Sequence, residues 1–483
     1  MAEIAQPVRT GVYSSEDFSL LINGALVGGT NRLDVIDPAT GQVLARAPAA
    51  SRAQLDDAVR AARTAFMTWR TTRYAERAEL VRAFAQRLRD RQQALAELLT
   101  REQGKPLAQS IAEIDRGAAQ SNGMVTIEIP TEVLVDDAER RIELKYRPLG
   151  VVGIITPWNA PVNLALGPLI SALYTGNTVV LKPSPYTPLT TLKLGEIARE
   201  IFPAGVVNVL SGGDELGQWL TEHDGIDKIS FTGSVATGKK VAAAAAGTLK
   251  RLTLELGGND AAIILDDVDP HAIAKKVFFA SFVNSGQVCM AIKRIYAHEK
   301  IYDALCDALV AEARQARVGN GLDPDTQLGP IQNEMQYDKV RDILEDTKRG
   351  GARILCGGDV PEGPGYFIPP TLVADIDEHS RLVQEEQFGP IVPLLKFSDV
   401  EDAIRRANDT RYGLSGSVWT NDLERGKALA ERLEVGTAWV NQHRATSAFV
   451  PFGGAKESGL GRQYSSIGLK GYMEPEVISV AKG

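Results

Sequence analysis

The sequence predicts an α/β fold built from two parallel-sheet domains and a small β-ribbon arm. From Gly150 onward, strand-like segments alternate with helix-like segments, which is the order that builds a parallel sheet with crossover helices. Residues 151–156 and 178–182 are near-continuous apolar runs, as expected of strands buried on both faces of a sheet. The chain of 483 residues is too long for one ordinary core, so two or three domains are expected.

Turn signals dominate the N-terminal region. Residues 1–16 are polar and predict a loose tail, without the basic and apolar segments of a secretory signal. Residues 19–27 hold two short apolar runs about Asn23 and Gly24, a strong hairpin signal. Residues 37–41 predict a further turn between two strands. This region is therefore expected to form antiparallel hairpins.

Helical and ribbon segments follow the hairpins. Residues 51–121 are rich in Ala, Leu, Arg and Glu and predict helices, with Ser51 as an N-cap and a break at residues 104–106. Residues 126–146 then alternate about a turn, which predicts a β-ribbon that serves as an arm or edge. Residues 476–480 predict a last strand that pairs with this ribbon. These strands would leave open edges in a monomer, so association of copies is expected.

The strand signals divide the rest of the chain into two sheets. Strands at residues 206–210 and 228–231 continue the first sheet, which is doubly wound and binds ligands beyond the carboxyl ends of its strands. A second α/β unit is expected from about residue 257. Its predicted strands lie near residues 261–265, 292–297 and 391–396.

Cys289 lies in an irregular part of the second unit. The chain holds three cysteines, too few for a disulfide framework or a thiolate cluster, so no metal site is expected. Residues 284–287 are Asn, Ser, Gly and Gln, which form strands and helices poorly and let the backbone approach a ligand. Since a free thiol is only roughly a few per cent ionised near pH 7, a nucleophilic Cys289 needs neighbours that generate its anion. Without them, it would be an ordinary buried thiol.

The charge and composition of the chain argue against two classes of partner, nucleic acids and membranes. The net charge of −8 and the isoelectric point near 5.4 argue against a nucleic-acid surface and against binding to anionic membranes. No run approaches the roughly 18 apolar residues of a membrane span. Three cysteines suit a reducing compartment. We therefore expect a cytoplasmic protein without nucleic-acid or membrane partners.

A short Gly-rich loop imitates a phosphate-binding motif. Gly233, Gly238 and Lys239 fit the loop of a nucleotide triphosphatase, but Lys240 stands where that loop requires a Mg²⁺-binding Ser or Thr. The sequence also has no G-x-G-x-x-G after a predicted strand. What remains is Gly233 and Ser234 between a strand and a helix, which is either an anion site at a helix N-terminus or a plain turn.

Several short motifs follow the strands in a fixed order. They are Thr156-Pro-Trp-Asn159, Lys182-Pro-Ser184, Phe231-Thr-Gly-Ser234, Leu254-Glu255-Leu-Gly-Gly258, Cys289, Glu385-Glu-Gln-Phe-Gly-Pro390 and Pro451-Phe-Gly-Gly454. Each is weak alone, but in this order and spacing they resemble the aldehyde dehydrogenase superfamily over nearly all of the chain. The resemblance implies an oxidoreductase that converts an aldehyde to a carboxylic acid with NAD⁺ or NADP⁺, of which NAD⁺ is favoured.

The resemblance also assigns a role to each part of the chain. It implies a Rossmann-like cofactor-binding domain, a catalytic domain and an oligomerisation arm, in a homodimer or homotetramer. The corresponding residues are 1–125 with 147–256 for the cofactor domain, 257–440 for the catalytic domain, and 126–146 with 465–483 for the arm.

By this resemblance, Cys289 is the expected nucleophile, Glu255 the general base and Asn159 the side-chain part of an oxyanion hole. The chemistry needs such a set. A thiolate adds to the aldehyde to give a thiohemiacetal, whose oxyanion requires two donors about 3 Å away. Hydride transfer to the nicotinamide then gives a thioester, and its hydrolysis needs a carboxylate that takes a proton from water. Glu255, at an apolar strand end, is placed for a raised pKa.

A set of cofactor contacts is implied in the same way. These contacts are Thr156, Trp158, Lys182, Ser184, Gly233, Ser234, Glu386 and Phe388. Many family members carry a Glu after the Lys182 strand that repels a 2′-phosphate, and here that position is Pro185, so the sequence does not exclude NADP⁺. A second acidic residue often follows the Gly-x-Gly-Arg near the C-terminus, and here it is Gln463, which leaves Glu255 as the base.

The expected substrate tunnel has few aromatic residues. Its candidate lining residues are Ala160, Gly167, Val283, Val288, Met290, Arg444, Thr446 and Phe452. Family members that act on small aldehydes often carry aromatic rings at four of these positions, Ala160, Gly167, Val283 and Thr446. A wide tunnel and a bulky apolar or aromatic aldehyde are therefore expected. Arg444 indicates an alternative, a semialdehyde with a remote carboxylate, unless it is a solvated loop residue.

Two relatives of such an enzyme remain as alternatives. A coenzyme A-acylating relative would lack the base, so Glu255 argues against it. A catalytically silent homologue that acts as a binding protein would be expected to have lost Cys289 or Glu255, and both are present.

Overall fold

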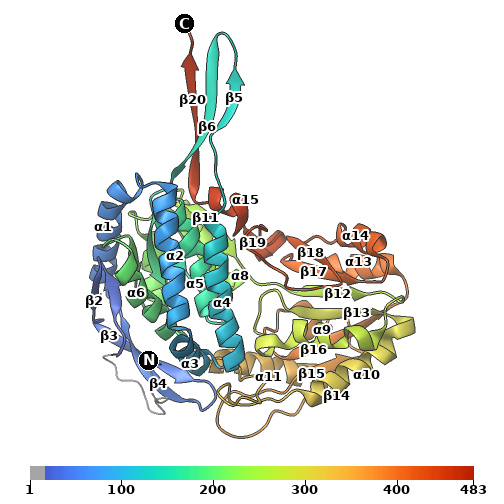
Figure 1. Ribbon diagram of the computed structural model, residues 1–483. Coiled ribbons are helices and arrows are strands. Elements are labelled where there is room, and N and C mark those ends of the chain that lie inside the picture. Colours follow the sequence, from blue (N-terminus) through green and yellow to red (C-terminus); the bar gives the residue numbers. More distant parts are fainter. Residues whose placement is uncertain (1–16) are drawn as a thin grey trace, which may run out of the picture.

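The computed structural model describes residues 17–483, so the loose tail expected at residues 1–16 lies outside the described residues. Figure 1 shows two lobes that each contain a sheet, and a three-stranded ribbon that projects from the first lobe. The predicted α/β fold with two mainly parallel sheets and a projecting ribbon is thus confirmed. Among residues 17–483, no helix combines the length and apolarity needed to cross a membrane. The location in the cell stays a prediction.

The first sheet reverses its direction of winding beside strand β7. Its strand order is β19-β11-β10-β7-β8-β9-β1-β2. The parallel strands are β7 (Val151–Ile155), β8 (Thr178–Lys182), β9 (Val207–Val209), β10 (Lys228–Thr232) and β11 (Arg251–Glu255). The chain runs outward from β7 through β8 to β9, and then returns to β10 on the other side of β7. Ligands of such sheets bind at this reversal, beyond the carboxyl ends of the strands.

Helices pack on both faces of this sheet. Those that contact its strands are α1 (Arg52–Trp69), α5 (Pro161–Tyr174), α6 (Leu189–Ile201), α7 (Asp214–Glu222) and α8 (Val235–Ala246). Helices α2 (Tyr74–Asp90), α3 (Gln92–Gln103) and α4 (Leu107–Met124) pack on α5 and α6 as an outer layer. Helix α5 contacts α6, whereas α7 contacts α1 and α8. This grouping follows from right-handed crossovers, because the connections before and after the reversal must lie on opposite faces.

Local signals account for the first element boundaries. Ser51 Oγ accepts a hydrogen bond from Gln54 N (3.2 Å), and Ser51 N donates to Gln54 Oε1 (3.0 Å), a capping box that begins α1. Gly104 ends α3 in the left-handed region, with φ of 97°. Asn23 and Gly24 also have positive φ, in the turn between β1 (Leu20–Ile22) and β2 (Ala25–Val27). The predicted N-cap, helix break and hairpin are confirmed.

A second hairpin packs beside the first lobe. Its strands are β3 (Asn31–Asp37) and β4 (Gln42–Ala49), joined at the turn predicted for residues 37–41.

The second sheet has the order β14-β15-β16-β13-β12-β17-β18. Its strands are β12 (Asp260–Ile264), β13 (Ile292–His298), β14 (Arg353–Cys356), β15 (Thr371–Ala374), β16 (Ile391–Phe397), β17 (Ser415–Trp419) and β18 (Thr437–Val440). Its helices are α9 (Pro270–Phe282), α10 (Glu299–Gln315), α11 (Glu334–Arg349), α12 (Arg381–Gln384), α13 (Val400–Asn408) and α14 (Leu423–Ala430). The predicted strands at β12, β13 and β16 are confirmed, and they form the buried centre of this sheet.

The ribbon consists of β5 (Glu132–Asp136), β6 (Arg140–Pro148) and β20 (Met473–Ala481), as Figure 1 shows. The pairing of β20 with β6 confirms the strand partner predicted for the end of the chain, with Val477 opposite Leu144. Val133, Leu134 and Val480 are exposed on the ribbon. Association of copies through this arm stays a prediction, and so does the division of the chain into domains.

One late segment returns to the first sheet. After β18, the chain passes through η3 (Lys456–Ser458) to β19 (Gly459–Leu460), which pairs antiparallel with β11. Glu255 lies opposite Gly459 in this pairing. Helix α15 (Ser465–Lys470) then leads into β20. The sequence did not predict this pairing, because β19 is too short to carry a periodic pattern.

Candidate active site

The carboxyl ends of β7, β8 and β10 bring the expected cofactor contacts to one edge of the first sheet. Thr156 and Trp158 follow β7, Lys182 ends β8 and Ser184 follows it, and Gly233 follows β10. Strands β7 and β10 are neighbours in the sheet, but the chain leaves β7 toward β8 and leaves β10 in the opposite direction, toward β11. The direction of winding therefore reverses between β7 and β10, and these residues lie at that point.

Ser234 at this edge caps a helix. Its hydroxyl accepts a hydrogen bond from Thr237 N (3.2 Å) at the start of α8, so the N-terminal dipole of α8 points out of the edge. Lys239, the lysine of the imitated phosphate loop, forms an ion pair with Glu457 (2.7 Å). Ser234 therefore lies at a helix N-terminus that can receive an anion, whereas Lys239 is paired with Glu457 and does not point to that anion site.

Lys182 is buried at this edge. Its Nζ donates to the carbonyl oxygen of Pro183 (3.2 Å), and burial lowers its pKa to about 8 against the opposing charge of Asp214. Thr156 is also buried, and its Oγ1 has no hydrogen-bond partner among the described residues. Ser184 Oγ accepts a bond from Tyr186 N (3.3 Å). This edge therefore presents a cation and an unbonded hydroxyl.

The Cys289 loop begins with three consecutive left-handed residues. Asn284, Ser285 and Gly286 have φ of 52°, 54° and 74°, so the irregular backbone expected before Cys289 is present. A Cβ at Gly286 would collide with the carbonyl oxygen of Gly389, so only glycine fits there.

Fixed donors hold the backbone around Cys289. Lys293 Nζ donates to the carbonyl oxygens of Val288 (2.9 Å) and Cys289 (2.6 Å). Asn159 Nδ2 donates to Gln287 O (2.9 Å), one residue earlier. His443 likewise bonds Met290 O through Nε2 (3.1 Å). The loop thus lies between Asn159 on one side and Lys293 and His443 on the other.

Of the residues that hold the Cys289 loop, Asn159 was predicted from the sequence and Lys293 was not. Asn159 was a candidate from its motif and lies beside the Cys289 loop as expected. Lys293 was missed, although its place four residues after Cys289 was visible in the sequence. Lys293 Nζ lies 3.7 Å from Glu386 Oε1. The Lys293 ammonium is therefore next to both the Cys289 loop and the Glu386 carboxylate.

The surroundings of Cys289 favour the neutral thiol over the thiolate. Burial raises its pKa to about 12, the carboxyls of Glu386, Asp260 and Glu255 raise it further, and Lys293 opposes them. Attack on a substrate therefore requires removal of the thiol proton during the reaction.

Glu255 ends β11 and is buried. Neither of its carboxyl oxygens has a hydrogen-bond partner among the described residues. Burial raises its pKa well above the ordinary value, and the nearby charge of Arg462 opposes the rise. A Cβ on Gly453 would lie 3.0 Å from Glu255 Oε1, so the absence of a side chain there leaves room beside the carboxyl. The raised pKa predicted for Glu255 agrees with this environment.

Glu386 and two rings close the junction between the lobes. Glu386 Oε1 accepts a hydrogen bond from Gly258 N (3.0 Å), and a Cβ on Gly257 would collide with its other oxygen. The Phe388 ring meets the Trp158 ring edge to face, with centroids 5.3 Å apart and planes at 89°. These contacts join the motif after β7 to the motif after α12.

The candidate tunnel residues differ in their surroundings. Ala160, Val283, Val288, Met290, Thr446 and Phe452 are all half-buried, whereas Gly167 is fully buried in α5.

Tyr464 lies beside Gly167, one of the four positions at which the absence of an aromatic ring was expected to widen the tunnel. A Cβ on Gly167 would lie 3.1 Å from Tyr464 Oη. Tyr464 is buried, and burial raises its pKa; Glu255 and Cys289 are near enough to raise it further, so the ring lies close to the reacting groups. The backbone of Tyr464 is in the left-handed region, with φ of 61°. Sequence reasoning missed Tyr464 because it enters from a segment that lies about three hundred residues later in the chain.

Arg444 is not a solvated loop residue. Its side chain is half-buried, and its Nε has no hydrogen-bond partner among the described residues. Burial lowers its pKa to about 10, Arg116 lowers it further, and Cys289 opposes the shift. The backbone of Arg444 is left-handed (φ 66°), and the neighbouring His443 bonds the Cys289 loop. A charged guanidinium with an unused donor therefore lies near the thiol.

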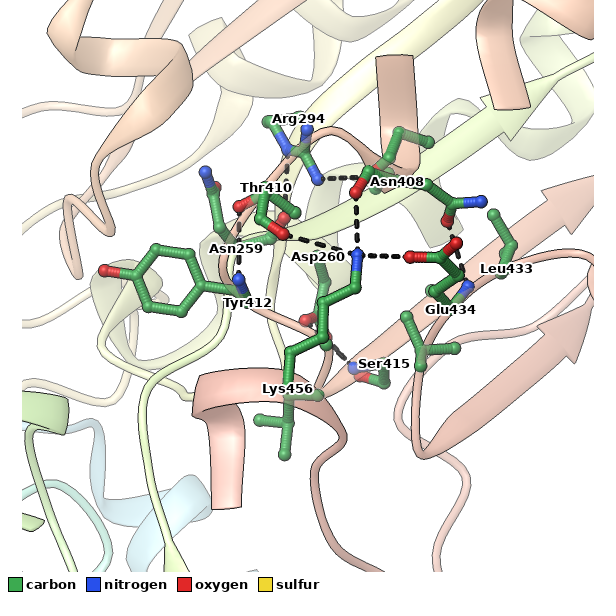
Figure 2. A pocket seen from close by; sticks show the side chains of 16 residues that line it. Asn259, Asp260, Arg294, Asn408, Thr410, Tyr412, Ser415, Leu433, Glu434 and Lys456 are labelled. Carbon is green, nitrogen blue, oxygen red and sulfur yellow. Dashed lines mark hydrogen bonds and ion pairs between the residues drawn. The ribbon is translucent and has the colours of Figure 1, made fainter. Parts of the chain in front are cut away.

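Figure 2 shows a separate pocket at the start of β12. Lys456 Nζ donates to the Thr410 carbonyl (3.3 Å) and pairs with Glu434 (2.6 Å), while Arg294 Nε donates to the Asn259 carbonyl (2.9 Å). Because these cations are bonded within the pocket, we interpret it as a structural cluster that anchors β12.

Comparisons with known proteins agree with this geometry. The chain matches the model of the aldehyde dehydrogenase family over residues 27–478. It is 40% identical over 467 residues to aldehyde dehydrogenase LUC3 of Fusarium, covering 96% of this chain and 99% of that protein. It is 40% identical over 472 residues to a probable aldehyde dehydrogenase of Pseudomonas, covering 97% and 95%. The NAD⁺ complex of aldehyde dehydrogenase from Bacillus cereus superposes with a TM-score of 0.94 at 35% identity, covering 96% and 97%.

The fold and these matches define an oxidoreductase with a dinucleotide-binding sheet and a second α/β lobe. The chain belongs to the aldehyde dehydrogenase family. NAD(P)⁺-dependent oxidation of an aldehyde is the general reaction of that family.

Proposed function

We propose that Cys289 is the nucleophile, Glu255 the general base and Asn159 an oxyanion donor in the oxidation of an aldehyde to a carboxylic acid. The observation that carries this assignment is the Glu255 carboxyl, buried without a bond to either oxygen in the same site as the Cys289 thiol. A buried unbonded polar group costs free energy of folding, so the fold gains nothing from it. Acceptance of a proton during the reaction accounts for its presence.

The steps follow from these positions. Cys289 gives its thiol proton to solvent water, and Sγ bonds to the aldehyde carbon as the carbonyl π bond opens to an oxyanion, which accepts bonds from Asn159 Nδ2 and the Cys289 N–H. NAD(P)⁺, when bound, supplies the hydride acceptor. Glu255 takes a proton from water, and the resulting hydroxide adds to the thioester carbon. The tetrahedral adduct then breaks its C–S bond and releases the carboxylic acid, and the proton held by Glu255 passes to the Cys289 thiolate.

The residues at the sheet edge suit a dinucleotide. The buried Lys182 ammonium and the unbonded Thr156 hydroxyl offer partners to ribose hydroxyls, and the α8 N-terminus at Ser234 suits a pyrophosphate. Glu386, with its pKa raised by burial, faces the site as an acceptor for the second ribose. The Trp158–Phe388 pair supplies an apolar wall. In this proposal Ser184 and Gly233 shape the same edge.

A panel of aldehydes assayed by absorbance at 340 nm tests the reaction and the cofactor. We expect turnover with NAD⁺ in the absence of coenzyme A, because Glu255 supplies the base for hydrolysis. We expect slower turnover with NADP⁺, within about a thousandfold or roughly 4 kcal/mol, since Pro185 offers no carboxylate against the 2′-phosphate. Reduction that requires coenzyme A would contradict the role of Glu255. A larger preference for NAD⁺ would identify another excluding group, for which Asp214 beside Lys182 is the candidate.

For the substrate, we propose an aldehyde that carries a remote carboxylate. The unused Arg444 Nε near the thiol, with the added positive charge of Arg116, favours an anion at that end of the tunnel. A guanidinium binds a carboxylate with two parallel hydrogen bonds. A bulky apolar or aromatic aldehyde is the second candidate. It is supported by the half-buried Val288, Met290 and Phe452, and weakened by Tyr464 at Gly167.

The variant Arg444→Leu separates these two candidates. The matched substrates are straight-chain aldehydes of equal length, with and without a terminal carboxylate. We expect kcat/KM for the acid-bearing aldehyde to fall about 10-fold to 100-fold, the loss of a charged hydrogen bond of roughly 1.5–3 kcal/mol. The plain aldehyde should change by less than about twofold.

The control is Arg353→Leu, which removes a guanidinium on edge strand β14 that is paired with Asp375 (2.7 Å) instead of lying unbonded near the thiol. Equal losses on both substrates in Arg444→Leu would mean a structural role for Arg444. A plain bulky aldehyde that remains the best wild-type substrate would favour the apolar candidate.

A further inference from the structure

A buried ion pair lies behind Asn159. Lys105, in the turn between α3 and α4, pairs with Glu113 of α4, and both side chains are at most 7% exposed. Both residues are far from Cys289 in the sequence, and no motif marked either of them as a candidate site residue. Burying two charges costs several kcal/mol of desolvation per ion, so a buried pair is poor evidence of a stabilising device. Its other contacts indicate what it does.

Lys105 holds the backbone of Asn159. Its Nζ donates to the Asn159 carbonyl oxygen (2.9 Å), which also accepts a bond from Asn284 Nδ2 (3.0 Å). Asn284 belongs to the Cys289 loop, and Asn159 Nδ2 donates to Gln287 O of the same loop (2.9 Å). Asn159 is therefore fixed at both its backbone and its side chain between Lys105 and the loop that carries the thiol.

Glu113 holds the helix that follows Asn159. Its Oε1 accepts bonds from Val162 N (3.0 Å) and Asn163 N (3.1 Å) in the first turn of α5. The N-cap residue of α5, Ala160, has no side-chain acceptor for the free N–H groups of the first turn. The Glu113 carboxylate of α4 accepts these hydrogen bonds instead. One turn earlier on α4, Gln109 Oε1 accepts from Asn284 N (3.2 Å). One face of α4 thus contacts both segments that meet at Asn159.

We propose that the Lys105–Glu113 pair positions Asn159 for oxyanion stabilisation, an inference that rests on the proposed role of Asn159. The pair touches neither the thiol nor the aldehyde. It fixes the main chain at the Asn159 carbonyl and in the first turn of α5 that follows, so that the free N–H of the amide keeps its direction toward the oxyanion. Such alignment matters because donors stabilise the transition state only when they are already in place. Loss of the pair should therefore slow bond formation at the thiol and leave cofactor affinity unchanged.

The test is a kinetic double-mutant cycle with Lys105→Met and Asn159→Ala, read as the rate constant of the first burst of reduced cofactor. We expect each single variant to lower this rate constant about 10-fold to 100-fold, up to the loss seen when an oxyanion donor is removed. Because Lys105 acts through Asn159, the double variant should be no slower than Asn159→Ala alone. The dissociation constant for NAD⁺ should stay within about twofold of wild type in all three.

A matched control comes from Glu102. This carboxyl is also fully buried and also accepts two N–H bonds at a helix start, from Leu189 (2.8 Å) and Thr190 (2.9 Å) of α6. We expect Glu102→Gln to lower the melting temperature much as Glu113→Gln does, and to leave the burst rate constant unchanged. If Lys105→Met fails to fold, Glu113→Gln takes its place in the cycle, because it keeps the size and an acceptor oxygen.

The possible outcomes separate the positioning role from the proposed function. A burst rate that Lys105→Met leaves unchanged, or effects that multiply in the double variant, would overturn the positioning role while Asn159 keeps its own. An unchanged burst in Asn159→Ala would overturn the oxyanion role of Asn159 and the positioning role with it. Equal burst losses in Glu102→Gln would show that capping in general, and not the direction of Asn159, controls the rate.

Discussion

Cys289→Ala is expected to lower aldehyde turnover by roughly 10⁴-fold or more, as removal of a covalent nucleophile does in other enzymes. The remaining groups bind the aldehyde and the cofactor, but none of them can form the bond to the carbonyl carbon. NAD⁺ affinity should change by less than about twofold, because the sulfur serves bond formation and not cofactor binding. Steady-state turnover together with NAD⁺ titration by fluorescence measures both quantities.

A second thiol provides the control for Cys289→Ala. Cys356 in β14 is half-buried like Cys289, but its Sγ lies against the Pro370 carbonyl (3.9 Å) in the outer part of the second sheet. Cys356→Ala should therefore keep full turnover. Substantial turnover in Cys289→Ala would end the covalent mechanism.

Glu255→Gln is expected to give a burst of about one reduced cofactor per site and then to stall as a thioester. Bond formation and hydride transfer come before water has to be activated, so they survive the loss of the base. Steady-state turnover should fall about 10²-fold to 10⁴-fold, the usual contribution of a general base. Rapid mixing with detection at 340 nm resolves the burst from the slow phase. If the burst disappears as well, Glu255 acts on the thiol proton and not only on water.

The pH dependence gives an independent measure of Glu255. A base works only when ionised, and burial raises the pKa of this carboxyl. Wild-type deacylation should therefore slow as the pH falls through that raised pKa, and Glu255→Gln should lose this dependence. The control is Glu457→Gln, a nearby carboxylate in an ion pair with Lys239, which should keep the wild-type profile. A profile that survives in Glu255→Gln would assign the titration to another group.

Local sequence determined those parts of this protein that depend on neighbours along the chain. The apolar run at residues 178–182 matches β8 at both ends, because a strand buried on two faces needs an unbroken apolar run. The hairpin about Asn23 and the cap at Ser51 follow from backbone preferences of single residues. The motifs around Asn159, Glu255 and Cys289 were identified by their order, and the fold brings them to one site.

Only the tertiary structure decided which distant side chains complete that site. Tyr464 occupies the room beside Gly167, and Lys105, in the turn before α4, bonds the Asn159 carbonyl while it pairs with Glu113 of α4. From the sequence alone, Arg444 could be a solvated charge or a ligand contact, and in the fold it is half-buried with its Nε unbonded among the described residues. The physical reason is the same in each case. Periodicity and capping act within a few residues, whereas these contacts depend on how whole helices and loops pack, which no local pattern records.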